Sequence, residues 1–220
     1  MPPSEGTSPP MILEKLPVGP LQANCYIVGC QQTRKGFIVD PGAEADIILD
    51  AIERAGLTIT HIFNTHEHVD HIAANRALKE ALGATLLVHE AGRAEVEQPH
   101  PYWAAMVGGV EPSQPDEGMR DGDSYQVGTL TLRVVHTPGH SPACVCLAVD
   151  GALFTGDTLF AGSVGRTDFP GGDTAMLNRS VRRLVKEFAE DTVIYPGHGA
   201  SSTIGEERRS NPFLRGIQAI

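Results

Sequence analysis

The stretch that decides the fold is Thr65-His66-Glu67-His68-Val69-Asp70-His71. It follows the apolar run 61–64, which predicts a β-strand, and it precedes the helix-like run 72–82. In extended chain, side chains two residues apart point the same way, so His66 and His68 can offer imidazoles to one metal ion. Asp70 and His71 lie where the chain turns into a helix, so they can address a second ion beside the first.

Packing does not explain three histidines and an aspartate so close together. A single histidine is usually an ordinary surface or core residue. Imidazoles gathered at the end of a strand are unfavourable, because they lose hydration and repel one another when protonated. Metal binding uses neutral imidazole and carboxylate together, so it accounts for the cluster.

Three further segments place a histidine or an aspartate beside glycine, each after a strand-like run: Thr137-Pro138-Gly139-His140-Ser141, Thr155-Gly156-Asp157 and Tyr195-Pro196-Gly197-His198-Gly199. Glycine lets the backbone turn sharply and leaves the neighbouring side chain exposed at the strand end, where function tends to lie. The candidate metal ligands are therefore His66, His68, Asp70, His71, His140, Asp157 and His198.

The rest of the pattern predicts a mixed α and β fold. Apolar stripes at helical spacing run through residues 47–55 and 177–188, the second after Asp173 and Thr174 as candidate N-caps. Strands between residues 125 and 154 follow one another without helices, so a purely parallel doubly wound sheet fits poorly. We expect two sheets packed together with helices outside. The predicted strands are 25–28, 36–39, 61–64, 85–88, 130–135, 145–149 and 193–195.

Composition argues against several kinds of partner. The 220 residues include 17 Lys and Arg against 27 Asp and Glu, a formal charge of −10, so a phosphate-binding surface for nucleic acid is not expected. No apolar run approaches the roughly 20 residues that span a bilayer, so we expect no membrane partner and a cytoplasmic location. Residues 1–10, rich in Pro, Ser and Gly, predict a disordered leader, and residues 11–220 predict a single metallo-hydrolase domain. The oligomeric state is left open.

The cysteines fall in apolar, strand-like runs, as Cys25 with Cys30 and Cys144 with Cys146. A structural zinc site built from both pairs is conceivable, but neither pair has the C-x2-C spacing of common zinc sites. Reduced core cysteines are the favoured interpretation.

Residues 98–118 form the longest stretch without clear periodicity, and they contain the only tryptophan, Trp103, with Tyr102 and Met106. Loops of this length are often functional. Two interpretations stay open. The segment either covers the substrate or is a surface excursion whose aromatic side chains pack back onto the body, and the second is slightly favoured.

Together these motifs resemble the metallo-β-lactamase superfamily, through His66-x-His68-x-Asp70-His71 and then His140, Asp157 and His198. The resemblance implies an α/β fold, a four-layer αββα sandwich with metals at the edge of its two sheets. It also implies one metal on His66, His68 and His140, and a second on Asp70, His71 and His198. Asp157 would bridge the two metals, and Asp70 and Asp157 are the candidate catalytic residues. Asp40 matches a family carboxylate that orients ligands, or it simply opens a turn.

Short glyoxalase II-like hydrolases resemble the chain more closely, through residues 19–24, 162–169 and 211–213. The similarity implies hydrolysis of a small thioester such as S-lactoylglutathione by a hydroxide bridging two divalent metal ions. Zinc is expected, with iron or manganese as alternatives. Within residues 162–169, Arg166 and Asp168 either line the site or form a structural ion pair.

Departures from the family patterns narrow these expectations. The commonest β-lactamases carry Cys where Asp157 stands and usually lack His71, so antibiotic hydrolysis is not expected. Only 22 residues follow His198. Full-length glyoxalase II continues there into a helical domain that helps bind glutathione, so glutathione recognition is left open.

The alternative function is that of an iron-dependent persulfide dioxygenase, which shares the string 165–169 and would use His66, His140 and Asp157 on one iron. Val164 stands where those enzymes typically have Cys, and Gly199 and Ala200 replace larger polar residues. The hydrolase is therefore favoured, and a noncatalytic metal-binding module is the weakest interpretation. We expect the remaining histidines to be dispensable for metal binding: His61, His89, His100 and His136.

Overall fold

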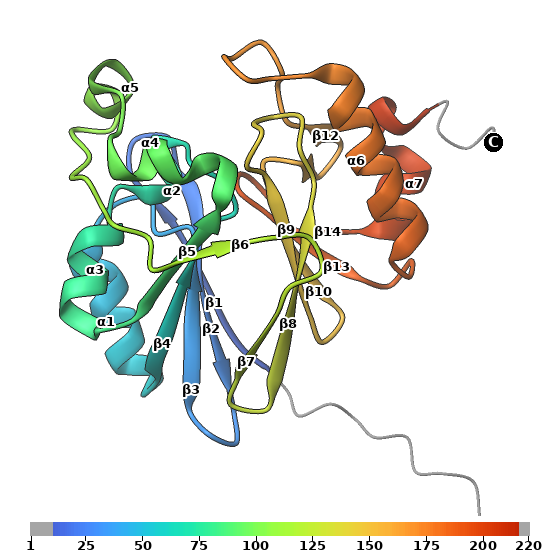
Figure 1. Cartoon of the computed structure of the whole chain (residues 1–220). Coiled ribbons are helices and arrows are strands. Elements are labelled where there is room, and N and C mark those ends of the chain that lie inside the picture. Colours follow the sequence, from blue (N-terminus) through green and yellow to red (C-terminus); the bar gives the residue numbers. More distant parts are fainter. Residues whose placement is uncertain (1–10, 216–220) are drawn as a thin grey trace, which may run out of the picture.

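The computed structural model describes residues 11–215, in which two six-stranded sheets pack against each other (Figure 1). The predicted leader, residues 1–10, lies outside the described residues, as do residues 216–220. The first sheet has the order β1-β2-β3-β4-β5-β6, formed by Met11–Val18, Ala23–Cys30, Lys35–Val39, Thr58–Phe63, Thr85–His89 and Glu117–Met119. The second has the order β14-β13-β10-β9-β8-β7, formed by Ser202–Thr203, Val193–Pro196, Ala152–Gly156, Val145–Val149, Leu130–His136 and Ser124–Val127. A small ribbon pairs β11, Leu159–Phe160, with β12, Ser163–Val164.

Helices cover the outer face of each sheet (Figure 1). Helices α1 (Ala45–Ala55) and α3 (Asn75–Leu82) lie on the first sheet, and α6 (Thr174–Glu187) and α7 (Ile204–Ser210) lie on the second. The shorter elements are α2, α4, α5, η1 and η2, formed by Val69–Ile72, Arg93–Glu97, Pro101–Met106, Glu90–Gly92 and Pro212–Leu214.

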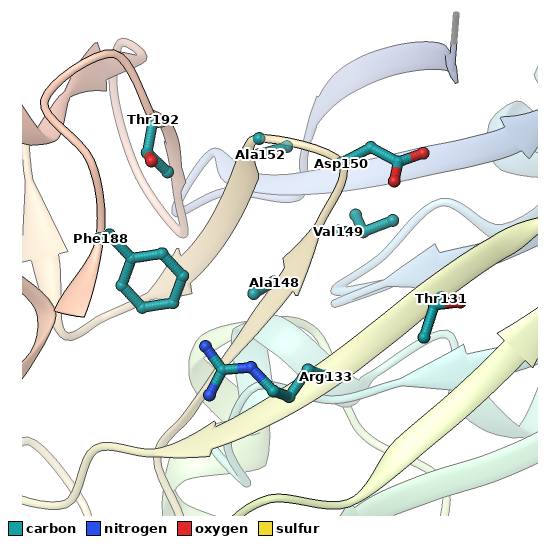
Figure 2. Close-up of a pocket in the computed structure, with 9 residues that line it drawn as sticks. Thr131, Arg133, Ala148, Val149, Asp150, Ala152, Phe188 and Thr192 are labelled. Atoms are coloured by element: carbon teal, nitrogen blue, oxygen red, sulfur yellow. The ribbon is translucent and has the colours of Figure 1, made fainter. Parts of the chain in front are cut away.

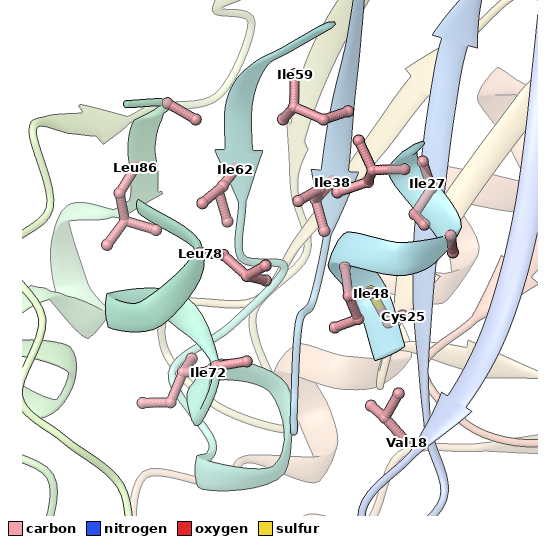
Figure 3. Packing of buried hydrophobic residues seen from close by; sticks show 14 of the residues in the cluster. Val18, Cys25, Ile27, Ile38, Ile48, Ile59, Ile62, Ile72, Leu78 and Leu86 are labelled. Carbon is pink, nitrogen blue, oxygen red and sulfur yellow. The ribbon is translucent and has the colours of Figure 1, made fainter. Parts of the chain in front are cut away.

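Three apolar layers join the four structural layers. Between the first sheet and its helices, Ile48 and Leu78 pack against Ile38 and Ile62 (Figure 3). The central layer joins the two sheets through residues such as Phe37, Phe63, Leu132 and Phe154. The third layer packs α6 and α7 on the second sheet through residues such as Leu177, Val181, Leu184, Ile194 and Ile204. The arrangement confirms the expected αββα sandwich. The single-domain interpretation stays a prediction.

Strand β1 was absent from the predicted strands. It pairs antiparallel with β2 along its whole length and forms the edge of the first sheet. Its sequence includes charged residues and Pro17, which blur the alternation of a strand. An edge strand tolerates proline because one side of its backbone has no strand to donate to.

The predicted helical run 72–82 is wrong in its bounds, because it consists of two helices. Asp70 and His71 already lie in α2, and α3 begins only at Asn75. Between them the amide of Ala74 donates to the carbonyl oxygen of Pro41 at 3.0 Å, so a tertiary contact redirects the chain. Because α2 begins at Val69, directly after the extended His68, Asp70 and His71 point in a different direction from His68.

Segment 98–118 is not the structureless stretch that its sequence suggested. Helix α5 begins after His100, whose Nδ1 accepts from the backbone amide of Tyr102 at 3.2 Å. A helix of six residues is too short to show a periodic pattern in the sequence.

The interpretation of Cys25, Cys30, Cys144 and Cys146 as core residues is confirmed, since all four are buried free thiols. Within residues 11–215, none of the helices is both long enough and apolar enough to cross a bilayer.

Candidate metal centre

All four ligand-bearing segments follow strands of the sandwich. Strand β4 ends at Phe63, two residues before Thr65, where the first segment begins. Strands β8, β10 and β13 are followed by His140, Asp157 and His198, respectively. The carbonyl oxygen of Thr65 accepts from the amide of Val145 at 2.8 Å, which ties the first segment to β9 of the other sheet. The structure thus brings together all seven predicted ligands.

The first cluster consists of His66, His68 and His140, whose ligand atoms lie within 4.8 Å of one another. His68 Nδ1 and His140 Nε2 are 2.9 Å apart. The ring centroids of His66 and His68 are separated by 4.7 Å. Three imidazoles that converge in this way supply the protein ligands of a typical metal site.

The second cluster consists of Asp70, His71 and His198, whose ligand atoms also lie within 4.8 Å of one another. Asp70 Oδ2 is 3.2 Å from His198 Nε2 and 3.6 Å from His71 Nε2. Here a carboxylate accompanies two imidazoles, whereas the first cluster consists of imidazoles alone.

Asp157 lies between the clusters. Its Oδ2 is 3.5 Å from His140 Nε2 in the first cluster and 3.8 Å from His198 Nε2 in the second. Its Oδ1 is 3.6 Å from His71 Nε2. One carboxylate therefore faces both sets of histidines, the placement that a bridging ligand requires.

Three buried side-chain atoms in residues 11–215 have no hydrogen-bond partner, namely His66 Nε2, His71 Nε2 and Asp157 Oδ1. All three belong to predicted ligands. A buried polar atom without a partner carries a desolvation penalty of about 1–3 kcal/mol. Metal ions held by the two clusters would satisfy all three atoms, so the residues present fit a metal centre.

The charges of the site agree with this fit. Burial, followed by neighbouring imidazoles, lowers the pKa of His66 well below its ordinary value, and burial and His140 lower the pKa of His68 to about 3. Both are therefore neutral, the form that binds metal. In the second cluster, burial also disfavours the charged form of His71. The nearby carboxylates of Asp70, Asp157 and Asp40 nevertheless raise the pKa of His71. Against the effect of burial, His71 and His198 lower the pKa of Asp70.

Asp40 holds the ligands in place. Its Oδ1 accepts from the backbone amide of Thr65 and its Oδ2 from the Thr65 hydroxyl, both at 2.6 Å. Its Oδ2 also lies 3.1 Å from Nδ1 of His71. Asp40 falls into a geometric group with His66 and His71, but both of its oxygens already have partners. The contacts favour the orienting role over the simple turn, because a hydrogen bond at Nδ1 leaves Nε2 of His71 aimed at the site.

The string 162–169 supports the first cluster through its backbone. The carbonyl oxygen of Arg166 lies 2.8 Å from Nδ1 of His140. The Arg166 guanidinium makes two bonds of 2.6 Å to the Asp168 carboxylate and lies over the ring of Phe169 at 4.0 Å. Both charged side chains are largely exposed. The side chains of Arg166 and Asp168 therefore form the structural ion pair, one of the two alternatives left open.

Residues near the chain start support the loop that carries His198, a role that the sequence did not reveal. The side-chain amide of Asn24 donates to the carbonyl oxygen of Pro196 at 2.8 Å, and the Tyr26 hydroxyl donates to the same oxygen at 2.7 Å. The backbone of Asn24 donates to the carbonyl oxygen of Gly197 at 2.7 Å. At Gly197 a Cβ would lie 2.2 Å from Asp157 Oδ1, so only glycine fits there.

The four histidines expected to be dispensable lie outside both clusters. His61 stacks on Phe63, and the rings of His89 and His136 stack on each other with centroids 4.1 Å apart. His100 caps α5. None of the four belongs to a potential metal-ligating group within the described residues.

Two hollows differ in their relation to the centre. One, lined by Arg133, Phe188 and neighbours on the second sheet, is shown in Figure 2. Arg133 is paired there with Glu187 and lies over the Phe188 ring, so its charge is already engaged. The other hollow, of about 620 Å³, is lined by His68 and Asp70 as well as by residues of segment 98–118. Segment 98–118 therefore lies beside the metal centre, and its aromatic residue Trp103 packs against Phe169 with centroids 5.5 Å apart.

Sequence comparison gives the chain several relatives. It is 33% identical over 209 residues to the hydroxyacylglutathione hydrolase GloC of Haemophilus influenzae, covering 93% of this chain and 98% of that protein. An uncharacterized protein of Aquifex aeolicus is 37% identical over 206 residues, with 92% and 97% of the two chains covered.

Among solved structures, that of the BLEG-1 B3 metallo-beta-lactamase is similar to this chain, with a TM-score of 0.84 and 34% identity. The match covers 92% of this chain and 99% of that one. The sequence argument against antibiotic hydrolysis rested on the commonest β-lactamases. Similarity to a protein named as a B3 metallo-beta-lactamase means that this argument does not cover every type of β-lactamase. That expectation stays a prediction. The family model of the metallo-β-lactamase superfamily matches residues 18–198, which include all seven candidate ligands. The chain belongs to the metallo-β-lactamase superfamily.

Proposed function

We propose that this metal-dependent hydrolase of the superfamily binds two divalent metal ions and hydrolyses a thioester, giving a carboxylic acid and a thiol. The observation that carries the proposal is the pair of ligand clusters joined by Asp157, with partnerless ligand atoms buried at their centre. Similarity to a protein named hydroxyacylglutathione hydrolase supports thioesters as the substrate class.

The chain's own residues set up the reaction. His66, His68 and His140 would hold one ion, and Asp70, His71 and His198 the other, with Asp157 shared. When bound, such ions lower the pKa of water to about 7 and polarise a carbonyl group. Asp40 and the carbonyl oxygen of Arg166 fix the imidazoles of His71 and His140, so the ligands need little reorganisation.

Zinc is our first choice of metal, and iron or manganese are the alternatives, because imidazole and carboxylate ligands suit all three. The metal content of protein purified without chelator should be about two ions per chain, as in two-metal hydrolases. A single tightly held ion, unchanged after zinc, iron or manganese is added, would contradict the dinuclear proposal.

The function is tested by following thiol release and oxygen uptake together. The protein is offered S-lactoylglutathione, simpler acyl thioesters, glutathione persulfide and a chromogenic cephalosporin. We expect thiol release from at least one thioester, its loss on chelation and its recovery when metal is returned. The His61→Asn variant, altered outside the clusters, should behave like the parent.

Two other outcomes would replace the proposal. Rapid oxygen uptake with the persulfide and inert thioesters would identify the dioxygenase, which uses His66, His140 and Asp157. Cleavage of the cephalosporin with inert thioesters would identify an antibiotic hydrolase. The same ligand clusters would serve either reaction.

A further inference from the structure

The hollow beside the metal centre has an apolar wall. Its lining includes Leu21, Tyr102, Trp103, Met106 and Phe169. Tyr102 and Met106 are 66% and 52% exposed, and Leu21 is 45% exposed, although all three are large and apolar or aromatic. Such a patch on the surface of a chain usually marks a binding site. Because His68 and Asp70 line the same hollow, whatever fills it lies against the metal ligands.

The charged groups of this hollow are acidic. Glu67 and Glu95 line it together with Asp70, and its lining contains no lysine or arginine within the described residues. The cation Arg166 lies over the ring of Phe169 at the edge of the hollow, but it is held by Asp168 through two bonds. The whole chain carries a formal charge of −10.

A glutathione thioester fits this wall poorly. Glutathione carries a carboxylate at each end of its peptide. The metal ions would take the reacting carbonyl group, so these carboxylates would lie against the rest of the lining, where Glu95 offers like charge and the described residues offer no lysine or arginine. An uncharged apolar arm would instead bury its surface against the aromatic side chains, with the favourable transfer energy of apolar area.

We propose that the hollow lined by Trp103, Met106 and Phe169 selects thioesters with an uncharged, apolar arm, and that it discriminates against anionic glutathione thioesters. This inference rests on the proposed thioesterase function and names its substrate class. Glu95 sets the charge preference, and Met106 contributes apolar contact area. Neither residue belongs to the metal ligands.

Trp103 makes the inference testable without catalysis. It is the only tryptophan of the chain, so intrinsic tryptophan fluorescence reports on this hollow alone. The metal-loaded protein is titrated with three thioethers that cannot be hydrolysed: S-benzyl-N-acetylcysteamine, S-benzylglutathione and S-methyl-N-acetylcysteamine. We expect a fluorescence change with the first, and binding at least about tenfold weaker for the other two.

Matched variants assign the preference to residues. Glu95→Lys should strengthen binding of S-benzylglutathione several-fold, whereas Glu53→Lys, the same charge change on α1, should leave it unchanged. Met106→Ala should weaken binding of the neutral benzyl ligand several-fold, whereas Met176→Ala on α6 should not. Met106 and Met176 are both well exposed, 52% and 40%, so neither change threatens folding.

The outcomes separate this inference from the proposed function. Equal or tighter binding of S-benzylglutathione, or no fluorescence response to the neutral benzyl ligand, would overturn the inference even if thioesters are hydrolysed. The expected binding order together with inert thioesters would leave the selective hollow standing and refute the thioesterase. Hydrolysis of phenylacetyl-N-acetylcysteamine in preference to phenylacetylglutathione would support both.

Discussion

Asp157 is the residue whose loss should affect the centre most, because its two oxygens face both clusters. We expect Asp157→Ala to lower metal content and to reduce thioester hydrolysis by more than about 100-fold, the upper range for residues that merely support ligands. Elemental analysis and circular dichroism on the same sample check metal and fold together. His61→Asn serves as the control. Near-normal turnover in Asp157→Ala would remove the bridging role.

Asp40 should act through charge and hydrogen bonding, not through direct metal contact. Its backbone is left-handed, with φ of 52°, a conformation that asparagine tolerates. Asp40→Asn should therefore fold normally, yet weaken metal binding by about 10–100-fold, because it loses the carboxylate that fixes His71 and Thr65. Competition with a chromogenic chelator measures this affinity. Unchanged affinity would reduce Asp40 to a turn residue.

At the scale of single residues, the sequence indicated which candidate ligands lie together in the structure, but not the residues that support them. The ligands repeat a residue pattern at strand ends, so their types and spacing could be recognised along the chain. The role of Asp40 could not be decided from the sequence, because its partners Thr65 and His71 lie 25 and 31 residues away along the chain. Asn24, whose partner Pro196 is 172 residues distant, was seen only as part of a motif.

Strand β2 positions the loop that carries His198, a candidate ligand of the second cluster. Asn24→Ala removes a buried hydrogen bond to the loop at Pro196 and should loosen His198 while leaving His66, His68 and His140 in place. We expect metal content to fall from about two ions to about one. The Asn24 side chain donates to two carbonyl oxygens of this loop, those of Pro196 and Gly199, whereas Tyr26→Phe removes a single bond, so its effect should be smaller. Equal loss of both ions in Asn24→Ala would show that the clusters depend on each other.

Elements were predicted best where they are long and buried. The apolar stripe of residues 177–188 and its cap are confirmed, since α6 spans Thr174–Glu187 and Asp173 accepts from the amide of Met176 at 2.8 Å. Edge strand β1 and short helix α5 were missed. In β1, charged residues and Pro17 interrupt the alternation of a strand, and α5 has only six residues, too few to show a helical repeat.

At the scale of the whole molecule, the order of elements was enough to predict the layers but not the hollow. Consecutive strands in the middle of the chain indicated two sheets packed face to face, and the apolar stripes at helical spacing indicated helices on the outer faces of those sheets. The hollow beside the metals draws residues from positions 21, 67–70, 91–106, 142 and 169–171. No local pattern in a sequence shows that such distant segments meet.

Metal binding should stabilise the whole sandwich, because the ligands follow strands of both sheets. A ligand present at 100 times its Kd adds about 2.7 kcal/mol, and 1 kcal/mol shifts the Tm of a chain of this size by about 2–4 °C. We therefore expect chelation to lower the Tm by about 5–10 °C, measured by calorimetry before and after the metal is returned. A Tm that is unchanged by chelation would mean that the centre contributes nothing to the fold.

The same stabilisation should depend on pH in a direction set by His71 and His198. Carboxylates raise the pKa of both groups against the effect of burial, Asp70 being the first of them. In the chelated protein these protonated histidines stabilise the fold at pH values below the ordinary histidine pKa, and that contribution is lost as the pH rises through the raised values.

Metal binding must displace the same protons, so metal affinity increases with pH over this range. The rising affinity widens the difference in Tm between loaded and chelated protein as the pH is raised from about 6 to about 8. Calorimetry at constant free metal measures this difference, and titrations in two buffers of different ionisation enthalpy count the protons released. A constant difference in Tm without proton release would show that His71 and His198 are already neutral before metal binds, and the charge balance inferred for the second cluster would then be wrong.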